Sequence, residues 1–315
     1  MRAIGVREFG GPDALQTVEL PEPQPGPGEV RIRVHAAAVN PTDTLFRAGA
    51  QASRLAGRRP PFVPGMDAAG IVDRIGPDGD GRLAVGDRVI VVMVPRGPHG
   101  GAYAEQIVAP AASVVPAPAG FDLPAASTLL MNALTARLTL DALALRPGQA
   151  VGVTGSAGAY GGYVIQLAKA DGLRVIADGS DADRDLVRTL GADEIVPRGD
   201  GISAAIRAVA PAGVAGVADG AVQLARTLPA IADGGGLAVV RGWKSAGERA
   251  IRVHEIQVAA SAEDTVRLDQ LRRQAEEGVL TLRVAQVLPA AEAAEAHKLL
   301  EAGGIRGRLV LDFTV

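Results

Sequence analysis

Residues 150–171 read AVGVTGSAGAYGGYVIQLAKAD, which is an apolar run, a glycine-rich turn and then an amphipathic pattern. The run at 150–154 is typical of a buried strand, and the apolar residues after Tyr160 recur at helical spacing. The glycines allow the backbone to approach a pyrophosphate, and the N–H groups that open the following helix attract its charge. This stretch therefore predicts a strand, turn and helix that bind the phosphates of a nucleotide.

The composition favours a protein that acts on small molecules. The chain has 315 residues, enough for two domains, with 32 basic and 35 acidic residues and a net charge of −3. This balance indicates no general affinity for nucleic acid or for an acidic membrane surface. There is no cysteine, which excludes disulfides and thiolate zinc ligands. No stretch is typical of a signal peptide or a membrane span, so we expect a cytoplasmic protein.

The pattern along the chain changes near residue 122. Before that point, short strands separated by Pro/Gly turns predict a β-rich module, with strands at 29–37, 69–75, 88–94 and 105–108. After it, apolar runs alternate with helical segments, as in a doubly wound parallel sheet. We expect its strands at 150–154, 173–178, 194–197, 214–219 and 237–241, with helices at 182–190, 202–210 and 221–232.

The last part of the chain is too short for a third domain. It predicts a further strand at 251–260, a charged helix at 263–277 and a final strand at 307–313. We expect this tail to return and pack on the first module. The predicted domains are therefore 1–122 completed by 261–315, and 123–260.

Seven motifs occur along the chain in a fixed order: VHAAAVNPTDTLFRAG (34–49), PFVPGMDAAGIV (61–72), GDRVIVV (86–92), GGAYAEQIV (100–108), NALTA (132–136), the glycine turn and GRLVLDF (307–313). Together they resemble the medium-chain dehydrogenase/reductase superfamily, specifically its zinc-free quinone oxidoreductase branch, over essentially the whole length. The resemblance implies an α/β fold class: a Rossmann-type doubly wound parallel sheet that binds a dinucleotide, plus a β-rich GroES-like catalytic domain.

The zinc ligands of the superfamily are replaced in this chain. Zinc-dependent members place a catalytic Cys ahead of an Asp in the first module, and a His-Glu pair in the segment that matches PGMDAAG. Here these positions read Thr42 ahead of Asp43, and Met66 followed by Asp67. A catalytic zinc ion takes about three protein ligands, and these positions offer no thiolate and no histidine. We therefore predict that no metal is bound.

The choice of cofactor depends on the segment after the second strand of the predicted dinucleotide sheet. An acidic residue about 20 positions beyond the glycine motif holds the ribose of NAD in many such folds, and Asp178 stands near that point. By the resemblance, however, the discriminating acid falls at Gly179, whereas Ser180 and Arg184 match residues that hold the 2′-phosphate of NADP. We predict NADPH, with NADH less favoured. In the alternative, Ser180 only caps the next helix and Arg184 is solvated.

Further cofactor contacts follow from the resemblance and from the carboxyl edge of the sheet. Asn132 and Thr135 match a helix beside the nicotinamide in relatives. Tyr160 replaces the usual valine of the glycine turn, and it contacts the cofactor or packs at a domain interface. Asp219 and Arg241 end successive strands, where they contact a ligand or form buried ion pairs. The predicted cofactor-binding set is Asn40, Asn132, Thr135, Ser156, Ala157, Gly158, Ala159, Tyr160, Asp178, Ser180, Arg184, Asp219, Arg241 and Gly242.

A metal-free site of this kind suits hydride transfer from NADPH to a quinone or an α,β-unsaturated carbonyl compound. The predicted catalytic residues are Asn40, Asp43 and Tyr103. We expect Asn40 to polarise a carbonyl oxygen or to contact the ribose, and Tyr103 or water to supply a proton. The alternatives are that Asn40 and Asp43 form a turn and cap a helix, and that Tyr103 is structural. His297 is expected on a surface helix.

Other functions remain open at this stage. A dedicated biosynthetic enoyl reductase shares the mechanism, and a non-catalytic NADP(H)-binding sensor or structural protein shares the fold. A hydrolase is disfavoured, because residues 154–158 lack the first glycine of the G-x-S-x-G elbow around Ser156. Loops at 47–61 and 95–101 are expected to shape the substrate pocket, and Arg54, Arg58 and Arg59 either recognise an anionic tail or are solvated. We expect a homodimer and a small-molecule substrate.

Overall fold

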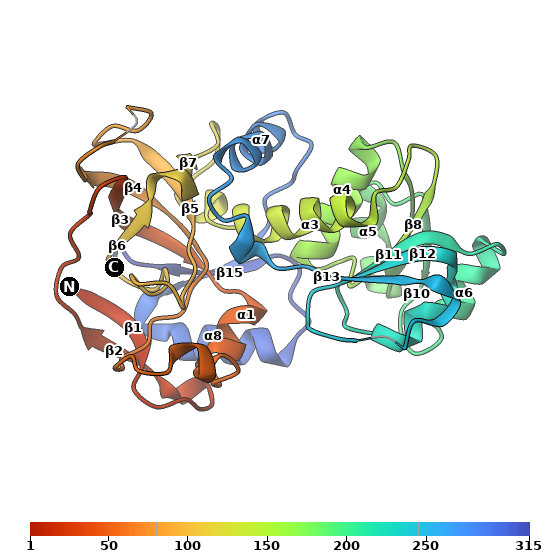
Figure 1. The fold of residues 1–315 in the computed structure, drawn as a ribbon, viewed down its shortest axis with the longest axis horizontal. Coiled ribbons are helices and arrows are strands. Elements are labelled where there is room, and N and C mark those ends of the chain that lie inside the picture. Colours follow the sequence, from red (N-terminus) through yellow and green to blue (C-terminus); the bar gives the residue numbers. More distant parts are fainter. Residues whose placement is uncertain (80, 245) are drawn as a thin grey trace. The chain divides into compact units, whose positions relative to one another are not determined.

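The computed structural model describes residues 1–79, 81–244 and 246–315, and the chain divides into two compact units. The first unit comprises Met1–Met131, Ala259–Glu277 and Leu282–Val315, and the second comprises Asn132–Val258 and Gly278–Thr281. Figure 1 shows their helices and strands, coloured along the chain. Across the described residues, no helix combines the length and apolarity that crossing a bilayer requires.

The first unit is built on a seven-stranded sheet in which most neighbours are antiparallel. The strand order is β14-β15-β3-β4-β5-β7, and β6 also pairs with β3. Along β3, Val30, Ile32 and Val34 are buried whereas Arg33 is exposed, as expected for a strand with one face on the core. The strands and helices of this unit are β1 (Arg2–Val6), β2 (Leu15–Glu19), β3 (Glu29–Ala38), β4 (Asp67–Ile75), β5 (Arg88–Val92), β6 (Gln106–Pro110), β7 (Val114–Pro116), β14 (Val284–Pro289), β15 (Arg308–Asp312), α1 (Pro41–Arg47), α2 (Leu123–Ala126), α7 (Thr265–Glu276) and α8 (Ala293–Ala302).

The final strand lies beside an early one. Strand β15 pairs antiparallel with the end of β3, with Val310 opposite Ala38. The end of the chain therefore returns to the sheet of the first unit. This pairing brings Arg308, the first residue of β15, to the part of the sheet from which α1 starts.

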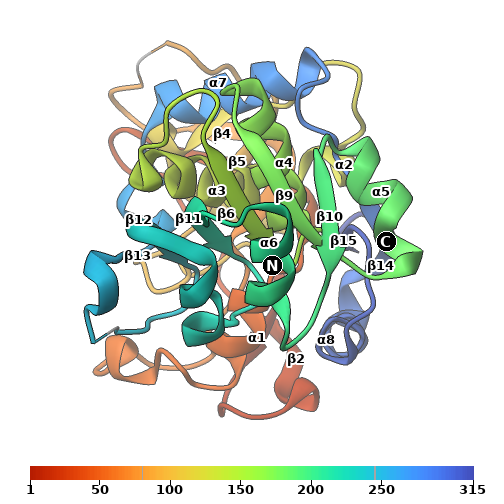
Figure 2. The same ribbon diagram turned by 90° about the vertical axis from the view of Figure 1, so that its right-hand side faces the viewer.

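The second unit contains a six-stranded parallel sheet in the order β10-β9-β8-β11-β12-β13. The first strand of the unit, β8, lies in the middle, so the chain winds outward in both directions, as predicted for a Rossmann-type fold. Figure 2 shows these strands side by side. The elements of this unit are α3 (Leu130–Leu143), β8 (Ala150–Thr154), α4 (Ala159–Ala170), β9 (Arg174–Gly179), α5 (Arg184–Thr189), β10 (Glu194–Pro197), α6 (Ile202–Val209), β11 (Val214–Asp219), β12 (Ile231–Val239) and β13 (Arg252–Glu255).

The helix predicted at 221–232 is wrong. The chain forms a 3-10 turn at Leu224–Ala230 and then enters β12 at Ile231. Two local features explain the difference. Pro229 lacks the N–H that a longer helix needs, and the Asp219 carboxylate accepts the N–H of Leu224 at 2.6 Å. The strand predicted at 251–260 is also shorter, because it ends at Glu255.

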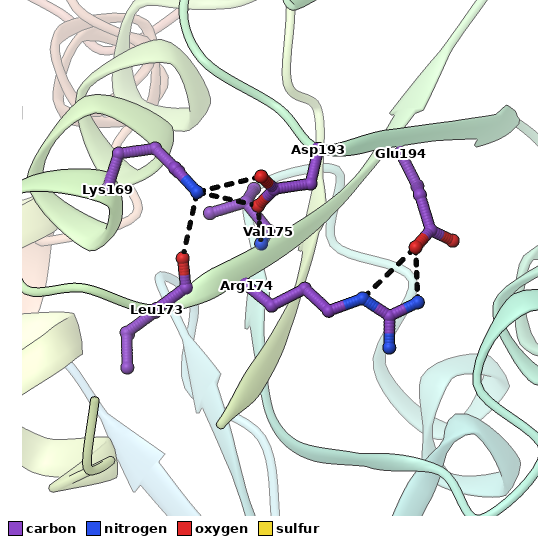
Figure 3. Close-up of polar contacts among 6 residues, drawn as sticks. All are labelled: Lys169, Leu173, Arg174, Val175, Asp193 and Glu194. Atoms are coloured by element: carbon purple, nitrogen blue, oxygen red, sulfur yellow. Dashed lines mark hydrogen bonds and ion pairs between the residues drawn. The ribbon is translucent and has the colours of Figure 1, made fainter. Parts of the chain in front are cut away.

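Ion pairs fix the edge of the second sheet where β9 and β10 meet (Figure 3). Lys169 Nζ lies 2.8 and 2.9 Å from the two carboxylate oxygens of Asp193, and the Val175 N–H donates to the same carboxylate at 2.7 Å. Arg174 pairs with Glu194 alongside. Burial raises the pKa of Asp193, but the Lys169 ammonium and the Val175 N–H outweigh it and hold the pKa below its usual value. These contacts support the register of β10 on β9.

Candidate functional site

The glycine turn joins β8 to α4 and leaves backbone donors at the start of the helix. Gly155 has φ of 69°, in the left-handed region that favours glycine. A Cβ on Gly161 would lie 2.4 Å from the Gly155 carbonyl oxygen, so α4 packs directly against the turn. Within the described chain, no side chain caps the helix at Gly158. The N–H groups of Ala159 and Tyr160 are therefore available to an anionic group, as predicted for a phosphate site.

Asp178 supports this turn from the neighbouring strand. Its Oδ1 accepts the backbone N–H of Ser156 at 2.9 Å, and Asp178 is only 5% exposed. The Ser156 hydroxyl donates to the Val153 carbonyl at 3.0 Å, and Ser156 is fully buried. Both side chains thus stabilise the turn from within, and the serine hydroxyl does not face solvent as a nucleophile would.

The segment that follows β9 forms ion pairs and hydrogen bonds with itself. Ser180 Oγ donates to Asp183 Oδ2 at 2.6 Å, and Arg184 Nε lies 3.2 Å from Asp181 Oδ1. The Arg184 side chain is 41% exposed and that of Asp181 is 99% exposed. An ion pair this exposed contributes little to stability, so an incoming anion can replace Asp181 as the partner of Arg184.

Tyr160 packs inside the second unit. Its hydroxyl lies 2.8 Å from Thr139 Oγ1, and burial raises the pKa of the phenol. A Cβ on Gly220 would lie 2.8 Å from Tyr160 Cδ1, so the ring occupies space that only a glycine leaves free. Gly220 thus accommodates the tyrosine that replaces the usual valine of the turn.

The remaining predicted cofactor residues are spread over the second unit. Asp219 is fully buried and accepts the Thr154 hydroxyl at 2.6 Å, which ties β11 to β8. Arg241 and Gly242 follow β12 and are exposed. Asn132 and Thr135 on α3 and Ala157 in the glycine turn are buried, with only small parts of their surfaces exposed.

A buried polar cluster lies in the first unit, where α1 begins. The Asn40 N–H donates to Asp43 Oδ2 at 2.8 Å, and Asn40 Nδ2 donates to Asp67 Oδ2 at 3.1 Å. Asp43 also accepts the Tyr103 hydroxyl and the Gly65 N–H, each at 3.2 Å. Asn40, Asp43 and Tyr103 are 0% exposed and Asp67 is 1% exposed. The structure therefore brings the three predicted catalytic residues together, and adds Asp67.

Burial dominates the electrostatics of this cluster. It raises the pKa of Asp43 to about 7 and that of Asp67 to about 6, although the Arg308 guanidinium opposes both shifts. Arg308 is itself 4% exposed and donates to the Val39 carbonyl. The same surroundings, burial first and then Asp43, raise the pKa of Tyr103. Two buried carboxylates thus depend on one buried cation.

His297 is buried in α8 and does not lie on a surface helix, so that prediction is wrong. Its Nε2 lies 3.3 Å from the Tyr103 hydroxyl, and the two rings meet edge to face with centroids 5.9 Å apart. Burial, and then the Arg47 charge, lower the pKa of His297 to about 3, so the ring is neutral near pH 7. Ala293, Ala296 and His297 form the buried side of the helix. The alanine spacing was the available signal for this inward face.

Sequence reasoning missed three members of the cluster. Asp67, Arg308 and His297 were not assigned to the site, yet all three are nearly or fully buried. Asp67 and Arg308 each open an apolar strand, and a charge at the edge of such a run was the available signal. Among the described residues, no group of three or more His, Asp or Glu side chains is arranged to hold a metal ion.

Comparison with known proteins identifies the family. Residues 26–119 match the alcohol dehydrogenase GroES-like domain, and residues 190–311 match the family described as zinc-binding dehydrogenase. A solved NAD-dependent alcohol dehydrogenase is 32% identical, with a TM-score of 0.86 and 99% of each chain covered. The chain belongs to the medium-chain dehydrogenase/reductase superfamily. A mycobacterial protein solved in complex with NADPH is 30% identical, with a TM-score of 0.88 over 99% of this chain and 100% of that chain.

Curated relatives refine the position of the chain within this superfamily. The quinone oxidoreductase of Rattus norvegicus is 34% identical over 200 residues, which cover 62% of this chain and 58% of the relative. That of Homo sapiens is 30% identical over the same shares of both chains. The chain thus spans less than two thirds of the length of these relatives, and its similarity to them is of the quinone oxidoreductase type.

Proposed function

We propose that this protein transfers a hydride from NADPH to a quinone or an α,β-unsaturated carbonyl compound, without zinc. The similarity to the quinone oxidoreductases of rat and human supports the reaction class. The observation that carries the proposal is the polar cluster at α1. Thr42, Met66 and Asp67 stand where zinc-dependent members have their ligands, and the carboxylates of the cluster are hydrogen-bonded to Asn40 and Tyr103.

The donor set of this cluster does not fit a zinc ion. Asp43 accepts hydrogen bonds from Asn40, Gly65 and Tyr103, and Asp67 accepts hydrogen bonds from Asn40 and Met131. Zinc in proteins favours thiolate and imidazole ligands, and Thr42 and Met66, at the positions of the ligands, offer neither. We therefore derive no step through a metal.

The second unit supplies the groups that fit a dinucleotide. The uncapped N–H groups of Ala159 and Tyr160 suit a pyrophosphate. Asp178 Oδ1 accepts the Ser156 N–H, and the next residue, Gly179, has no side chain to bind the ribose of NADH. Ser180 and Arg184 then offer a hydroxyl and a cation to a 2′-phosphate. When bound, NADPH supplies the hydride.

The residues around α1 act mainly by position. Asn40 and Asp43 hold the start of α1, and Tyr103 donates its hydroxyl to Asp43, so hydrogen bonds join all three within the cluster. We assign the proton that completes the reduction to water. The cytoplasmic location and the homodimer stay predictions. So do the predicted boundaries of the catalytic and dinucleotide-binding domains.

The test measures oxidation of NADPH and of NADH by the full chain against a panel of quinones and enones. We expect turnover with NADPH, and Arg184→Ala should raise the KM for NADPH about tenfold or more while sparing NADH. Arg188→Ala is the matched control, because Arg188 lies on the same helix and pairs with Asp185 at the surface.

Each contrary outcome has a distinct meaning. Equal losses with both cofactors in Arg184→Ala would remove the 2′-phosphate role. Turnover that a metal chelator abolishes would contradict the zinc-independent reaction. Binding of NADPH with no turnover across the panel would assign the chain as a non-catalytic sensor, and turnover of enones alone would favour a dedicated enoyl reductase.

A further inference from the structure

Two loops of the first unit carry cations and no carboxylates. We call residues 51–59 and 95–101 the basic loops. There is no Asp or Glu between Asp43 and Asp67, or between Asp87 and Glu105, whereas the basic loops contain Arg54, Arg58, Arg59 and Arg96. In a chain with a net charge of −3, these stretches are strongly biased toward positive charge.

Arg58 holds the two basic loops together. Its Nη1 donates to the Arg96 carbonyl at 2.7 Å, and its Nη2 donates to the Pro98 carbonyl at 3.1 Å. These acceptors are neutral, so the contacts fix the loops without cancelling the charge of Arg58. The backbone at Arg96 is thereby held next to the loop that bears Arg54.

The charges of Arg54 and Arg96 interact across the two basic loops, and neither side chain has a counter-ion among the described residues. Burial and the neighbouring Arg54 guanidinium lower the pKa of Arg96. In the described parts of the chain, neither side chain forms an ion pair or donates a hydrogen bond. Arg54 is exposed and Arg96 is half-buried, and an anion that pairs with both guanidinium groups would relieve their repulsion.

The basic loops lead directly to the polar cluster at α1. The Gly101 N–H donates to the Val63 carbonyl at 3.0 Å, and the Ala102 N–H donates to the Gly65 carbonyl at 2.9 Å. Gly65 in turn donates its N–H to Asp43 Oδ1. A molecule held by an anionic group at the basic loops is therefore next to chain segments that contact the cluster, all within the first unit.

We propose that Arg54 and Arg96 bind an anionic group, a carboxylate or a phosphate, on the substrate. The inference rests on the proposed reduction and specifies its substrate class as a quinone or enone that carries such a group. Planar guanidinium groups pair with carboxylates and phosphates through two parallel hydrogen bonds. A pair of guanidinium groups matches one small anion, and the negative net charge of the chain disfavours a nucleic acid as the ligand.

The test compares a charged substrate with its uncharged methyl ester in the wild type and in each variant, so that the intrinsic difference in reactivity of the two compounds cancels. (E)-4-oxopent-2-enoic acid and its methyl ester carry the same enone, and only the acid carries a carboxylate. We expect the full chain to prefer the acid, and Arg54→Gln and Arg96→Gln each to lower the acid-to-ester ratio of kcat/KM about tenfold. Arg226→Gln is the matched control, because Arg226 is an exposed arginine that pairs with Asp200 in the second unit. It should leave the ratio unchanged.

A binding measurement separates this inference from the proposed reaction. Calorimetry with inorganic phosphate and with the acid, on the wild type and the three variants, needs no turnover. Weaker binding of either anion in Arg54→Gln and Arg96→Gln supports the site even if the enone is not reduced, and shows whether carboxylate or phosphate is preferred. The KM for NADPH is measured in parallel.

Three outcomes would overturn the inference. Equal use of acid and ester, together with anion binding that the two substitutions do not change, would leave Arg54 and Arg96 as solvated cations. A change in the KM for NADPH without a change in the acid-to-ester ratio would mean that Arg54 and Arg96 bind a phosphate of the cofactor and not an anionic group of the substrate. Tight binding of duplex DNA that both substitutions weaken, with no effect of phosphate or acid, would assign them to nucleic acid.

Discussion

Carboxylates have opposite surroundings in the two units. In the first unit, Asp43 and Asp67 are buried with Arg308 as their counter-charge, and burial raises both pKa values. In the second, the Asp193 side chain is 37% exposed, and Lys169 helps to hold its pKa below the usual value. Buried charges cost free energy of folding, whereas an exposed pair contributes a modest gain. The contrast indicates that the cluster is kept for its geometry, and the edge of the second sheet for stability.

The largest expected effect comes from removing the cation of the cluster. Arg308→Met should lower the free energy of unfolding by about 3–5 kcal/mol at a pH of about 8, because two carboxylates stay buried without a counter-charge. The loss should be smaller at a pH of about 5, where protons neutralise Asp43 and Asp67. Urea unfolding at both pH values measures it. Arg174→Met is the control, since it breaks an ion pair at the edge of the second sheet and should cost about 1 kcal/mol or less. Equal losses at both pH values in Arg308→Met would contradict the role assigned to Arg308.

The second effect is a pH dependence that originates in Asp43. The pKa of this carboxyl is about 7 in the folded chain and 3.8 without the fold, so the folded state keeps a proton that the unfolded state loses. Its contribution to stability is complete below a pH of about 4 and is lost as the pH rises through about 7, by about 1.4 kcal/mol per pH unit for one proton.

Asp43→Asn isolates this contribution from that of His297. The pKa of His297 falls from 6.5 to about 3 on folding, so this residue stabilises the fold above pH 6.5 and loses that effect as the pH falls. Because both proteins contain His297, its term cancels in the difference between them. We expect the unfolding free energy of the wild type minus that of Asp43→Asn to decrease from a pH of about 4 to a pH of about 7. A difference in unfolding free energy that does not change with pH would mean that a group other than Asp43 takes up the proton.

The third effect concerns the glycine turn, where the expected change in stability comes from close packing of the backbone and not from charged groups. Gly161→Ala forces a Cβ to within 2.4 Å of the Gly155 carbonyl oxygen. We expect a loss of about 1–3 kcal/mol in unfolding free energy, with no dependence on pH, and weaker binding of NADPH. Gly201→Ala is the control, because a Cβ there has open space, and it should change stability by about 0.5 kcal/mol or less. Comparable losses in the two variants would mean that Gly161 is not required for the close approach.

The smallest effect is expected at the edge of the second sheet. Asp193→Asn keeps an acceptor for the Val175 N–H but removes the charge that pairs with Lys169. The loss should be about 0.5–1 kcal/mol in dilute buffer and should shrink as salt is added. Thermal unfolding at low and high salt measures it. If Asp193→Asn lowered the free energy of unfolding as much as Arg308→Met does, the buried and exposed carboxylates would not differ in the way described above.

The sequence was most informative where a single segment determines the structure. Strands β8, β10 and β11 have the predicted bounds, because their apolar runs are set off by Gly, Pro or charged residues. The glycine turn was also predicted, since its glycines and the following helix are adjacent. The partners of Asp43 were not predictable in this way. Arg308 lies near Asp43 because β15 pairs with β3, and His297 of α8 contacts Tyr103, which donates to Asp43. Both come from the end of the chain.

The pairing of β3 with β15 also has a consequence for the order in which the protein folds during synthesis. Every strand of the parallel sheet has been synthesised once Glu255 is made, so that sheet can form as it emerges, before the chain is finished. The sheet of the first unit cannot close until residue 308 and those after it emerge. Asp43 and Asp67 therefore lack Arg308 through most of translation, and Arg308 is the cation that lowers the pKa of both carboxyls in the complete fold.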